Sequence, residues 1–204
     1  MNLQELKAII DRGEDGQHQF KADEFITTIK AITFIGARSA MSDYLDDPKA
    51  YMDVEEVNGK LLNVFLEALR FVNRNLHHLQ AGQSVNSRGE LEIPLVVFEE
   101  LIANALLHRD YFVSATIRLL IFRDRIEIIS PGHLPSNLTV ARIKLGNSNI
   151  RNPILVSFAS RILPYRGLGS GIMRALAAYP DIEFVDDREN NLFKAIIQRP
   201  PFPG

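Results

Sequence analysis

Apolar residues recur along this chain with two different periods, and each period predicts its own kind of secondary structure. From Gly59 onward, apolar positions three and four residues apart predict one long helix that ends near His78. Its expected core-facing positions are Leu62, Phe65, Leu69, Val72, Leu76 and Leu79. A second helix is expected to start at Pro94, because proline suits the first turn of a helix, and to end at about residue 110.

Runs of β-branched and apolar residues predict two hairpins. Residues 115–122 and 125–130 form the first, with a tight turn at Arg123-Asp124, and IEFVDD and LFKAIIQ form the second, with a turn at Asn190-Asn191. Short helices are expected over 138–165, and a glycine-rich turn leads into a helix over 166–179. This order predicts an α+β fold, a two-layer sandwich of helices on one face of a mostly antiparallel sheet.

The N-terminal part is less regular. Residues 1–30 are predicted to be partly helical, and residues 42–56 hold six acidic residues and a proline, which predicts an exposed connector. No stretch has the roughly 18 apolar residues of a membrane span or the pattern of a secretory signal. The chain has no cysteine, so disulfides and thiolate metal sites are excluded and a reducing compartment fits. We therefore expect a cytoplasmic protein without membrane partners.

Positive charge is concentrated in the middle of the chain. Residues 109–174 hold 10 basic and 3 acidic residues, although the whole chain has a net charge of −2. This favours an anionic ligand near that segment, either a nucleotide phosphate or a nucleic-acid backbone. A solvated surface balanced by the acidic N-terminal part is the alternative, and charge alone leaves both open.

The helix after Pro94 carries three polar residues in one row. Glu100, Asn104 and His108 are spaced by four and share one side of a helix whose other residues are mostly apolar. A helix this apolar is expected to be buried, and buried polar groups need partners, which a cavity with water or ligand supplies. Glu100 is then a candidate general base, and Asn104 offers a neutral oxygen to Mg²⁺. A solvent-facing row is the structural alternative.

A glycine-rich turn supplies a second candidate feature. Gly167, Gly169 and Gly171 precede a predicted helix start, where free amides and the helix dipole attract phosphate. No dinucleotide-binding βαβ unit fits around this turn, and the chain has no GxxxxGK[ST] element. A P-loop ATPase or helicase motor is therefore not expected.

The order of these motifs resembles that of the GHKL ATPases, the superfamily of DNA gyrase, heat-shock chaperones, histidine kinases and MutL. ELIAN at residues 100–104 is similar to the Glu-x-x-x-Asn helix of that family, and GLGSGI is similar to its second glycine box. The resemblance implies the Bergerat fold, with Glu100 as catalytic, water-activating residue and Asn104 as metal ligand. Gly167, Gly169 and Gly171 would hold the phosphates of ATP beside a mobile lid.

A closer resemblance rests on ELIANALLHRDY, DRIEIISPGHLPS, RNPIL and GLGSGIMR. These segments look like the C-terminal part of bacterial proteins described as transcriptional regulators or as ATP-dependent DNA helicase RecG-related proteins. Such proteins pair a Schlafen-type AlbA-like DNA-binding domain with an ATPase-like domain. The resemblance implies an ATPase-like domain over 55–204, preceded by a shortened N-terminal remnant and acidic connector over 1–54. It implies nucleotide as a ligand and DNA as a partner.

The chain departs from the superfamily at the first glycine box. SPGHL, residues 130–134, stands where that box has Asp-x-Gly-x-Gly, so Ser130 replaces the aspartate that reads adenine while Gly132 is retained. Four lid residues are candidate phosphate ligands, namely Asn147, Asn149, Arg151 and Arg166. His108 is a further candidate ligand contact. Helix capping and local ion pairing are the alternative for His108 and Arg109. Helix capping is also the alternative for Arg151-Asn152, which precede Pro153.

Two hypotheses follow. The first is a nucleotide-binding, ATPase-like module of a bacterial DNA-linked regulator, which uses ATP and Mg²⁺ and in which hydrolysis is an open question. The second is a non-catalytic scaffold for homodimerisation or for binding DNA or a partner, with a decayed nucleotide site. The absent adenine-reading aspartate favours the second, and the ordered motifs favour the first for fold and ancestry.

Overall fold

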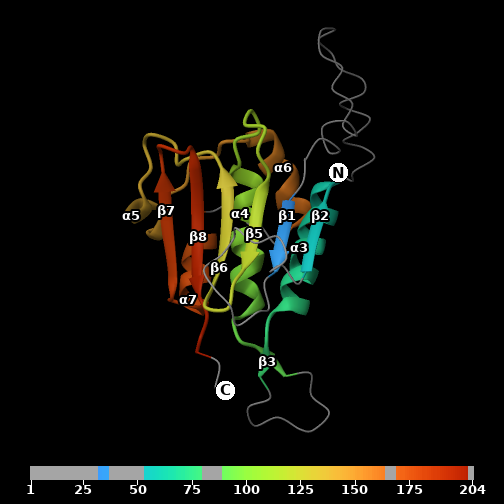
Figure 1. Ribbon diagram of the computed structural model, residues 1–204. Helices are drawn as coiled ribbons and strands as arrows, with labels where there is room; N and C mark the ends of the chain where they lie inside the picture. The colour runs from blue at the N-terminus through green and yellow to red at the C-terminus, as the bar shows by residue number, and fades with distance from the viewer. Residues whose placement is uncertain (1–31, 37–52, 80–88, 164–168, 202–204) are drawn as a thin grey trace.

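The computed structural model describes residues 32–36, 53–79, 89–163 and 169–201, which form a sheet covered by helices on one face (Figure 1). The strands are β1 (Ile32–Gly36), β2 (Asp53–Val57), β3 (His78–Leu79), β4 (Glu90–Leu91), β5 (Ile117–Ile121), β6 (Arg125–Pro131), β7 (Ile182–Asp187) and β8 (Leu192–Gln198). The helices are α3 (Leu61–Asn75), α4 (Leu95–His108), α5 (Val140–Lys144), α6 (Pro153–Ile162) and α7 (Gly171–Ala178). The predicted order of helices and hairpins is confirmed.

The main sheet has the strand order β2-β1-β5-β6-β8-β7. Within the described strands, β1 and β5 pair in parallel and the other neighbours in this sheet pair antiparallel. The two predicted hairpins are β5–β6 and β7–β8. In the first, the Phe122 N–H donates to the Arg125 carbonyl at 2.8 Å, which closes the tight turn at Arg123-Asp124. The mostly antiparallel sheet is therefore confirmed.

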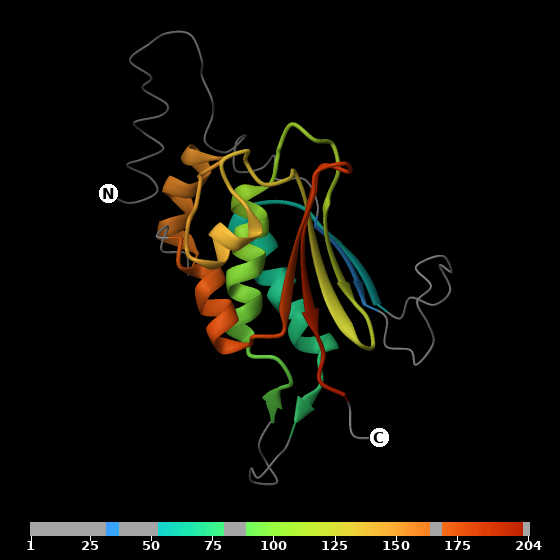
Figure 2. The same ribbon diagram turned by 90° about the vertical axis from the view of Figure 1, so that its left-hand side faces the viewer.

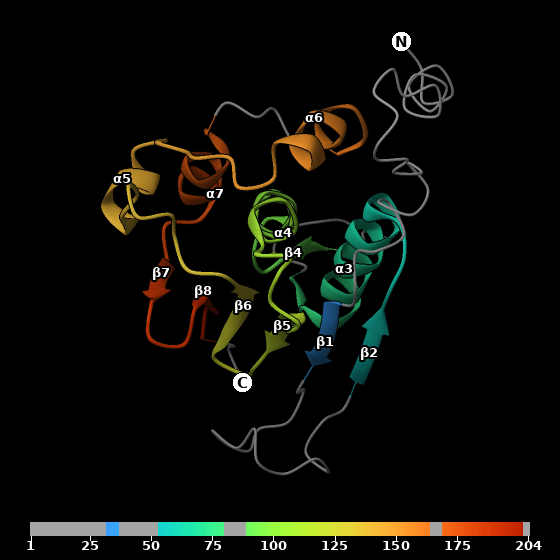
Figure 3. The ribbon, with the colours of Figure 1, turned by 90° about the horizontal axis from the view of Figure 1, so that it is seen from above.

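The helices form a layer on one side of this sheet, as the view from above shows (Figure 3). α4 lies over the centre, α3 covers the β1–β2 side, and α7 lies on the other side of α4 (Figures 2 and 3). The core between the layers is apolar and almost fully buried, with Phe71, Phe98, Leu106, Leu107, Leu119, Ile126 and Ile197 among its largest side chains. This burial holds α4 firmly against the sheet, and α4 carries the polar row.

The core-facing side of α3 differs in part from the expectation. Val64, Ala68 and Phe71 are fully buried, whereas Leu62 and Leu69 pack half-buried at the margin of the core. The helix ends at Asn75, so Leu79 falls in the short strand β3 and is 38% exposed. The prediction is confirmed for Phe65, Val72 and Leu76, which are buried. It missed the rest of the buried side, which Val64, Ala68 and Phe71 occupy.

The predicted exposed connector over 42–56 is wrong for its last four residues, which belong to strand β2. In this strand the Glu55 carboxylate pairs with Arg74 of α3 at 2.5 Å. β2 includes residues on both sides of the domain boundary that the sequence predicted after residue 54. The boundary itself stays a prediction. Residues 1–30 and 42–52, for which a partly helical segment and the rest of the connector were expected, lie outside the described residues.

Candidate functional site

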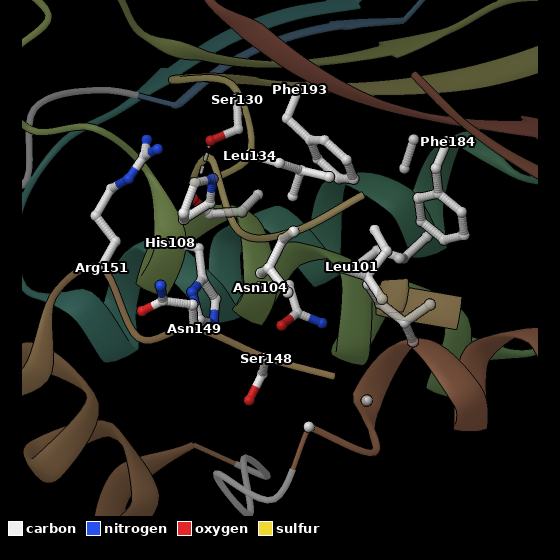
Figure 4. A pocket seen from close by; sticks show the side chains of 18 of the residues that line it. Leu101, Asn104, His108, Ser130, Leu134, Ser148, Asn149, Arg151, Phe184 and Phe193 are labelled. Carbon is white, nitrogen blue, oxygen red and sulfur yellow. Dashed lines mark hydrogen bonds between the residues drawn. The ribbon is translucent and has the colours of Figure 1, made fainter. Parts of the chain in front are cut away.

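A cavity of about 100 Å³ lies between α4, the sheet and two outer segments (Figure 4). α4 contributes Leu101, Asn104, Ala105 and His108 to its wall. The sheet contributes Ile128, Ser130, Phe184, Phe193 and Ala195. The outer wall consists of Asn147, Ser148, Asn149, Arg151, Gly169, Ser170, Gly171 and Arg174. Residues far apart in the sequence thus surround a single hollow.

The walls of this cavity differ in chemistry. The Phe184 and Phe193 rings stack at a centroid distance of 6.0 Å and make the sheet wall flat and apolar. The outer wall is polar and carries the Arg151 and Arg174 guanidinium groups, and among the described residues no aspartate or glutamate lines the cavity. Such a cavity suits a ligand with one flat apolar part and one anionic part.

The structure brings most of the sequence-predicted site residues together. Asn104, His108, Gly132, Arg151, Gly169 and Gly171 all line this one cavity. Gly167 and Arg166 lie outside the described residues. Glu100 is close by but is not part of the cavity wall. The ligand roles assigned to these residues stay predictions.

The Glu100 carboxylate points toward α7 rather than into the cavity. Its side chain is 6% exposed, and Oε1 accepts from Arg174 Nη2 at 2.7 Å. Its Oε2 lies close to Gly171, because a Cβ at that glycine would approach Oε2 to 2.6 Å. A general base needs access to water, so the structure adds a partner to Glu100 that the catalytic prediction did not include.

Asn104 lies one turn after Glu100 and faces the cavity (Figure 4). Its Nδ2 donates to the Glu100 carbonyl at 2.9 Å within α4. This bond fixes the amide, and within the described part of the chain nothing donates to the Oδ1 atom. A neutral, oriented oxygen of this kind can complete the coordination of Mg²⁺ when phosphate oxygens supply the other ligands.

Arg151 lies beside His108 at the polar side of the cavity (Figure 4). Its Nη2 donates to the His133 carbonyl at 2.5 Å, while its Nη1 is buried and has no hydrogen-bond partner within the described part of the chain. Gly132 makes room for this guanidinium, because a Cβ there would lie 2.0 Å from Nη1. A buried cationic donor without a partner favours an anionic ligand.

The capping alternative for Arg151-Asn152 is confirmed in position only, since Asn152 is the N-cap residue of α6. Asn152 precedes α6 but makes no side-chain cap for it, and its Nδ2 donates instead to the Leu107 and Arg109 carbonyls at 2.9 and 2.8 Å. Asn152 therefore satisfies the last carbonyls of α4 and fixes that helix end beside Arg151. The Arg109 side chain donates to the Val113 and Ala115 carbonyls, so it orders the loop that follows α4.

Burial lowers the pKa of His108 below its usual 6.5, and the nearby Arg151 charge lowers it further, against the opposing effect of a hydrogen bond with the Asn149 backbone. His108 is therefore neutral at pH 7. The unfolded chain binds this proton more readily than the folded protein, so the stability supplied by neutral His108 is lost as pH falls below about 6.5.

This pKa shift gives a pH prediction. Between pH 7 and 5.5 we expect the midpoint of urea unfolding to fall, and to fall less in His108→Gln, because the variant has no proton to take up on unfolding. Equilibrium denaturation of both proteins at matched pH values measures the difference. Parallel pH profiles would show that His108 does not carry this dependence.

Ser130, at the position of the adenine-reading aspartate, is buried and has another task. Its Oγ donates to the Ala105 carbonyl at 3.2 Å and links β6 to α4. The hydroxyl hydrogen is thereby used within the protein. No carboxylate from the described residues reaches this wall of the cavity.

The glycine turn packs against the preceding segment of the chain. Gly169 has a φ of +70°, and a Cβ there would lie 2.2 Å from the Gly146 carbonyl oxygen. α7 then starts at Gly171, and Ser170 supplies no side-chain cap, so the first amides of α7 border the cavity without a capping oxygen. These are the features of a helix start that accepts an anion.

Several cavity residues were not predicted from the sequence, among them Leu101, Ser148, Arg174, Phe184 and Phe193. Arg174 had a usable signal, since it follows Gly171 by three residues and must share its side of the helix. The two phenylalanines and Ala195 also lie on the same face of the last hairpin, because Phe184 pairs with Ala195 and Phe193 is two residues before Ala195. Their position over the cavity depends on long-range strand pairing, which the local pattern does not contain.

Two further features are absent from the part of the chain that the structure describes, a cluster of metal-binding side chains and a membrane-spanning helix. Among the described residues, no group of three or more His, Asp or Glu side chains could hold a metal ion by itself. Within the same part of the chain, no helix combines the length and apolar character that crossing a bilayer requires.

Comparisons with known proteins agree with the fold. The chain is similar to the DIP2311 protein from Corynebacterium diphtheriae, with a TM-score of 0.68 and 17% sequence identity over 85% of this chain and 35% of that chain. This likeness concerns the fold alone, and the present chain spans about a third of that protein. No curated protein matches the chain.

The protein family that matches the sequence is described as "Putative ATP-dependent DNA helicase recG C-terminal", and the match covers residues 114–192. It includes Gly132, Arg151 and the glycine turn, whereas α4 with Asn104 precedes it. Over residues 114–192, this chain is therefore similar to the family of RecG C-terminal domains.

Proposed function

We propose that this domain binds a nucleotide, with ATP as the first candidate, in the cavity between α4 and the glycine turn. The observation that carries the proposal is the composition of the cavity wall: stacked aromatic rings on one side, two arginines on the other, and no carboxylate from the described residues. The matching family is described as ATP-dependent, which is consistent with this ligand.

The walls suggest how a nucleotide would lie. The base would pack against Leu101, Phe184 and Phe193, because these side chains offer apolar area. The phosphates would lie at the outer wall, where the amides at the start of α7 and the Arg151 guanidinium favour negative charge. This arrangement is consistent with a Bergerat-type fold, which we propose for the domain.

Mg²⁺ fits this arrangement only together with the phosphates. Asn104 Oδ1 would be the protein ligand, since the described wall contains no carboxylate, and phosphate oxygens and water would supply the other ligands. The ion would neutralise phosphate charge. The chain's own residues would orient the nucleotide and exclude water from the apolar wall.

Binding requires a change at the outer wall. The cavity of about 100 Å³ is smaller than the roughly 300–1,000 Å³ of typical ligand pockets. At the outer wall, Gly169 packs against the Gly146 carbonyl, so the segment that leads into Asn147 contacts the glycine turn. We therefore propose that residues 145–149 act as a lid that moves away from the glycine turn, and that the changed surface signals to DNA or to a second copy of the chain.

Two observations favour a second candidate function, a scaffold without nucleotide turnover. Ser130 donates within the protein in place of the adenine-reading carboxylate, and Glu100 is paired with Arg174. Under this alternative the same fold would serve dimerisation or partner binding only. The protein would then neither hydrolyse ATP nor change the structure of the cavity when nucleotide is added.

A titration with Mg-ATP tests the proposal. We expect Arg151→Ala to weaken ATP binding roughly 10–100-fold, as loss of a charge-assisted hydrogen bond predicts. Arg161→Ala is the matched control, because it removes the same charge from the exposed end of α6. Isothermal titration calorimetry gives both dissociation constants. No binding by the wild-type protein at millimolar ATP would contradict the proposal, and equal losses in both variants would point to long-range charge only.

A further inference from the structure

Arg174 and Glu100 form an ion pair at the edge of the cavity. Arg174 belongs to α7 and lines the cavity, whereas the Glu100 carboxylate lies behind the wall and is 6% exposed. One guanidinium nitrogen, Nη2, is 2.7 Å from Glu100 Oε1. Another, Nε, is buried and has no hydrogen-bond partner among the described residues. Arg174 therefore has a donor left over at the cavity edge.

The position of Arg174 relative to the glycine turn is also informative. Gly171 and Arg174 are three residues apart on α7 and lie on the same side of the helix. A ligand anion held by the amides at Gly171 would therefore lie within reach of the Arg174 side chain. Arginine can bind phosphate with two parallel hydrogen bonds. A carboxylate that contacts only one guanidinium nitrogen leaves the other donors available for phosphate.

The two cavity arginines mark different ends of the site. The Arg151 charge lowers the pKa of His108, and Arg174 forms an ion pair with Glu100. Glu100 and His108 are eight residues apart on α4, which is about 12 Å along a helix. A nucleotide with several phosphates extends over such a distance, whereas one with a single phosphate does not need both cations.

We propose that Arg174 is a second phosphate-binding residue, which exchanges Glu100 for the terminal phosphate of a bound nucleotide. This inference rests on the proposed nucleotide function. In the nucleotide-free protein, Arg174 keeps the buried Glu100 carboxylate paired. On binding, the guanidinium turns to the phosphate, and Glu100 is left next to it without its cation. The ion pair thus competes with the ligand for Arg174.

Competition of this kind predicts a gain of affinity when Glu100 is neutralised. In Glu100→Gln, Arg174 has no carboxylate to leave, so we expect ATP to bind roughly fivefold to tenfold more tightly than to the wild-type protein. AMP has no terminal phosphate to reach Arg174, so its affinity should stay the same. Both dissociation constants are measured by calorimetry on the full chain with Mg²⁺ present.

The double variant separates partner exchange from simple charge repulsion. Arg174→Met keeps the length of the side chain and should weaken ATP binding roughly tenfold. In the Glu100→Gln/Arg174→Met protein, the gain from Glu100→Gln should disappear, because the exchanged group is absent. The double variant lacks an unpaired buried carboxylate. If Arg174→Met alone folds poorly, the ATP affinity of the double variant is compared with that of Glu100→Gln, and we expect it to be weaker.

The outcomes distinguish this inference from the proposed function. If Glu100→Gln improves ATP binding equally with and without Arg174, repulsion alone explains the gain and the exchange is overturned. If Arg174→Met does not change ATP affinity, or if AMP gains as much as ATP, the exchange is also overturned while nucleotide binding stands. If no variant binds ATP, the proposed function fails, and the inference fails with it.

Discussion

Replacing Arg199 with alanine is expected to lower the free energy of unfolding by about 3–5 kcal/mol, the cost of leaving a buried charge without its partner. Arg199 Nη2 donates to Glu92 Oε1 at 2.6 Å, and the two side chains are only 5% and 2% exposed. Arg199 Nη1 also donates to the Phe122 carbonyl at 2.6 Å. Alanine removes these bonds and leaves the Glu92 carboxylate buried.

The effect is large because the Arg199 contacts join segments from different parts of the chain. Glu92 lies just before α4 and also accepts from the His77 backbone N–H at 3.0 Å, beyond the end of α3. Arg199 follows β8 directly, so the pair connects the last strand of the chain to both core helices. Loss of the pair therefore loosens the packing that positions α4.

Urea denaturation followed by circular dichroism measures the change in stability. Arg70→Ala is the control, because Arg70 pairs with Glu67 on the exposed side of α3, with the arginine side chain 65% exposed. An exposed pair of this kind contributes about 0–1 kcal/mol, so the control should change stability little. Similar losses in the two variants would show that burial of the Arg199–Glu92 pair does not set its contribution.

Gly132→Ala is expected to cost about 2–5 kcal/mol of stability, from a left-handed backbone penalty of about 1–2 kcal/mol and an overpacking cost of about 1–3 kcal/mol. Gly132 has a φ of +100°. An added Cβ would lie 2.6 Å from Asp110 Cβ and 2.0 Å from Arg151 Nη1. The variant must therefore displace both the loop after α4 and the cavity arginine.

Gly59→Ala separates these two contributions. Gly59 has a φ of +131°, but nothing lies within 4 Å of its Cβ position, so only the backbone penalty applies there. Thermal and urea unfolding of both variants should show a larger loss for Gly132→Ala, accompanied by weaker ATP binding because Arg151 moves. Equal losses of stability, with ATP affinity unchanged, would mean that Gly132 serves only the backbone turn.

The sequence predicted the second hairpin with its boundaries because every determinant is local. Strands over 182–187 and 192–198 are rich in β-branched and apolar residues, and the turn between them contains Asn191 with a φ of +52°. Asparagine tolerates this left-handed conformation better than most residues. The polar row on α4 was predicted for the same reason, since helical spacing depends on nearby residues alone.

The strands β1 and β2 could not be placed in the same way. β1 pairs in parallel with β5, so its partner lies far away in the sequence, with Ile32 opposite Ile117. β2 is an edge strand that contains Asp53, Glu55 and Glu56, and acidic residues are rare in strands. Its pairing with β1 outweighs this low propensity. The β-branched residues of ITFIG were the one local signal available for β1.

The candidate site was predictable as a set of residues but not as a set of contacts. Helical spacing placed Glu100 beside Asn104, yet the Arg174 partner depends on how closely α4 and α7 approach. That approach is set by Gly171, where a Cβ would lie 2.6 Å from Glu100 Oε2 and 3.1 Å from Asn104 Nδ2. The partner of a buried carboxylate is a property of tertiary packing, which a single sequence does not specify.

The structure of the protein in crystals soaked with Mg²⁺ and a non-hydrolysable ATP analogue tests the central claim most directly. We expect the base against Phe184 and Phe193, and the phosphates within hydrogen-bond distance of Arg151 and the amides that start α7. An analogue bound elsewhere on the molecule, or crystals soaked at millimolar concentration in which the cavity keeps its closed Gly146–Gly169 contact and no analogue is bound, would contradict the account.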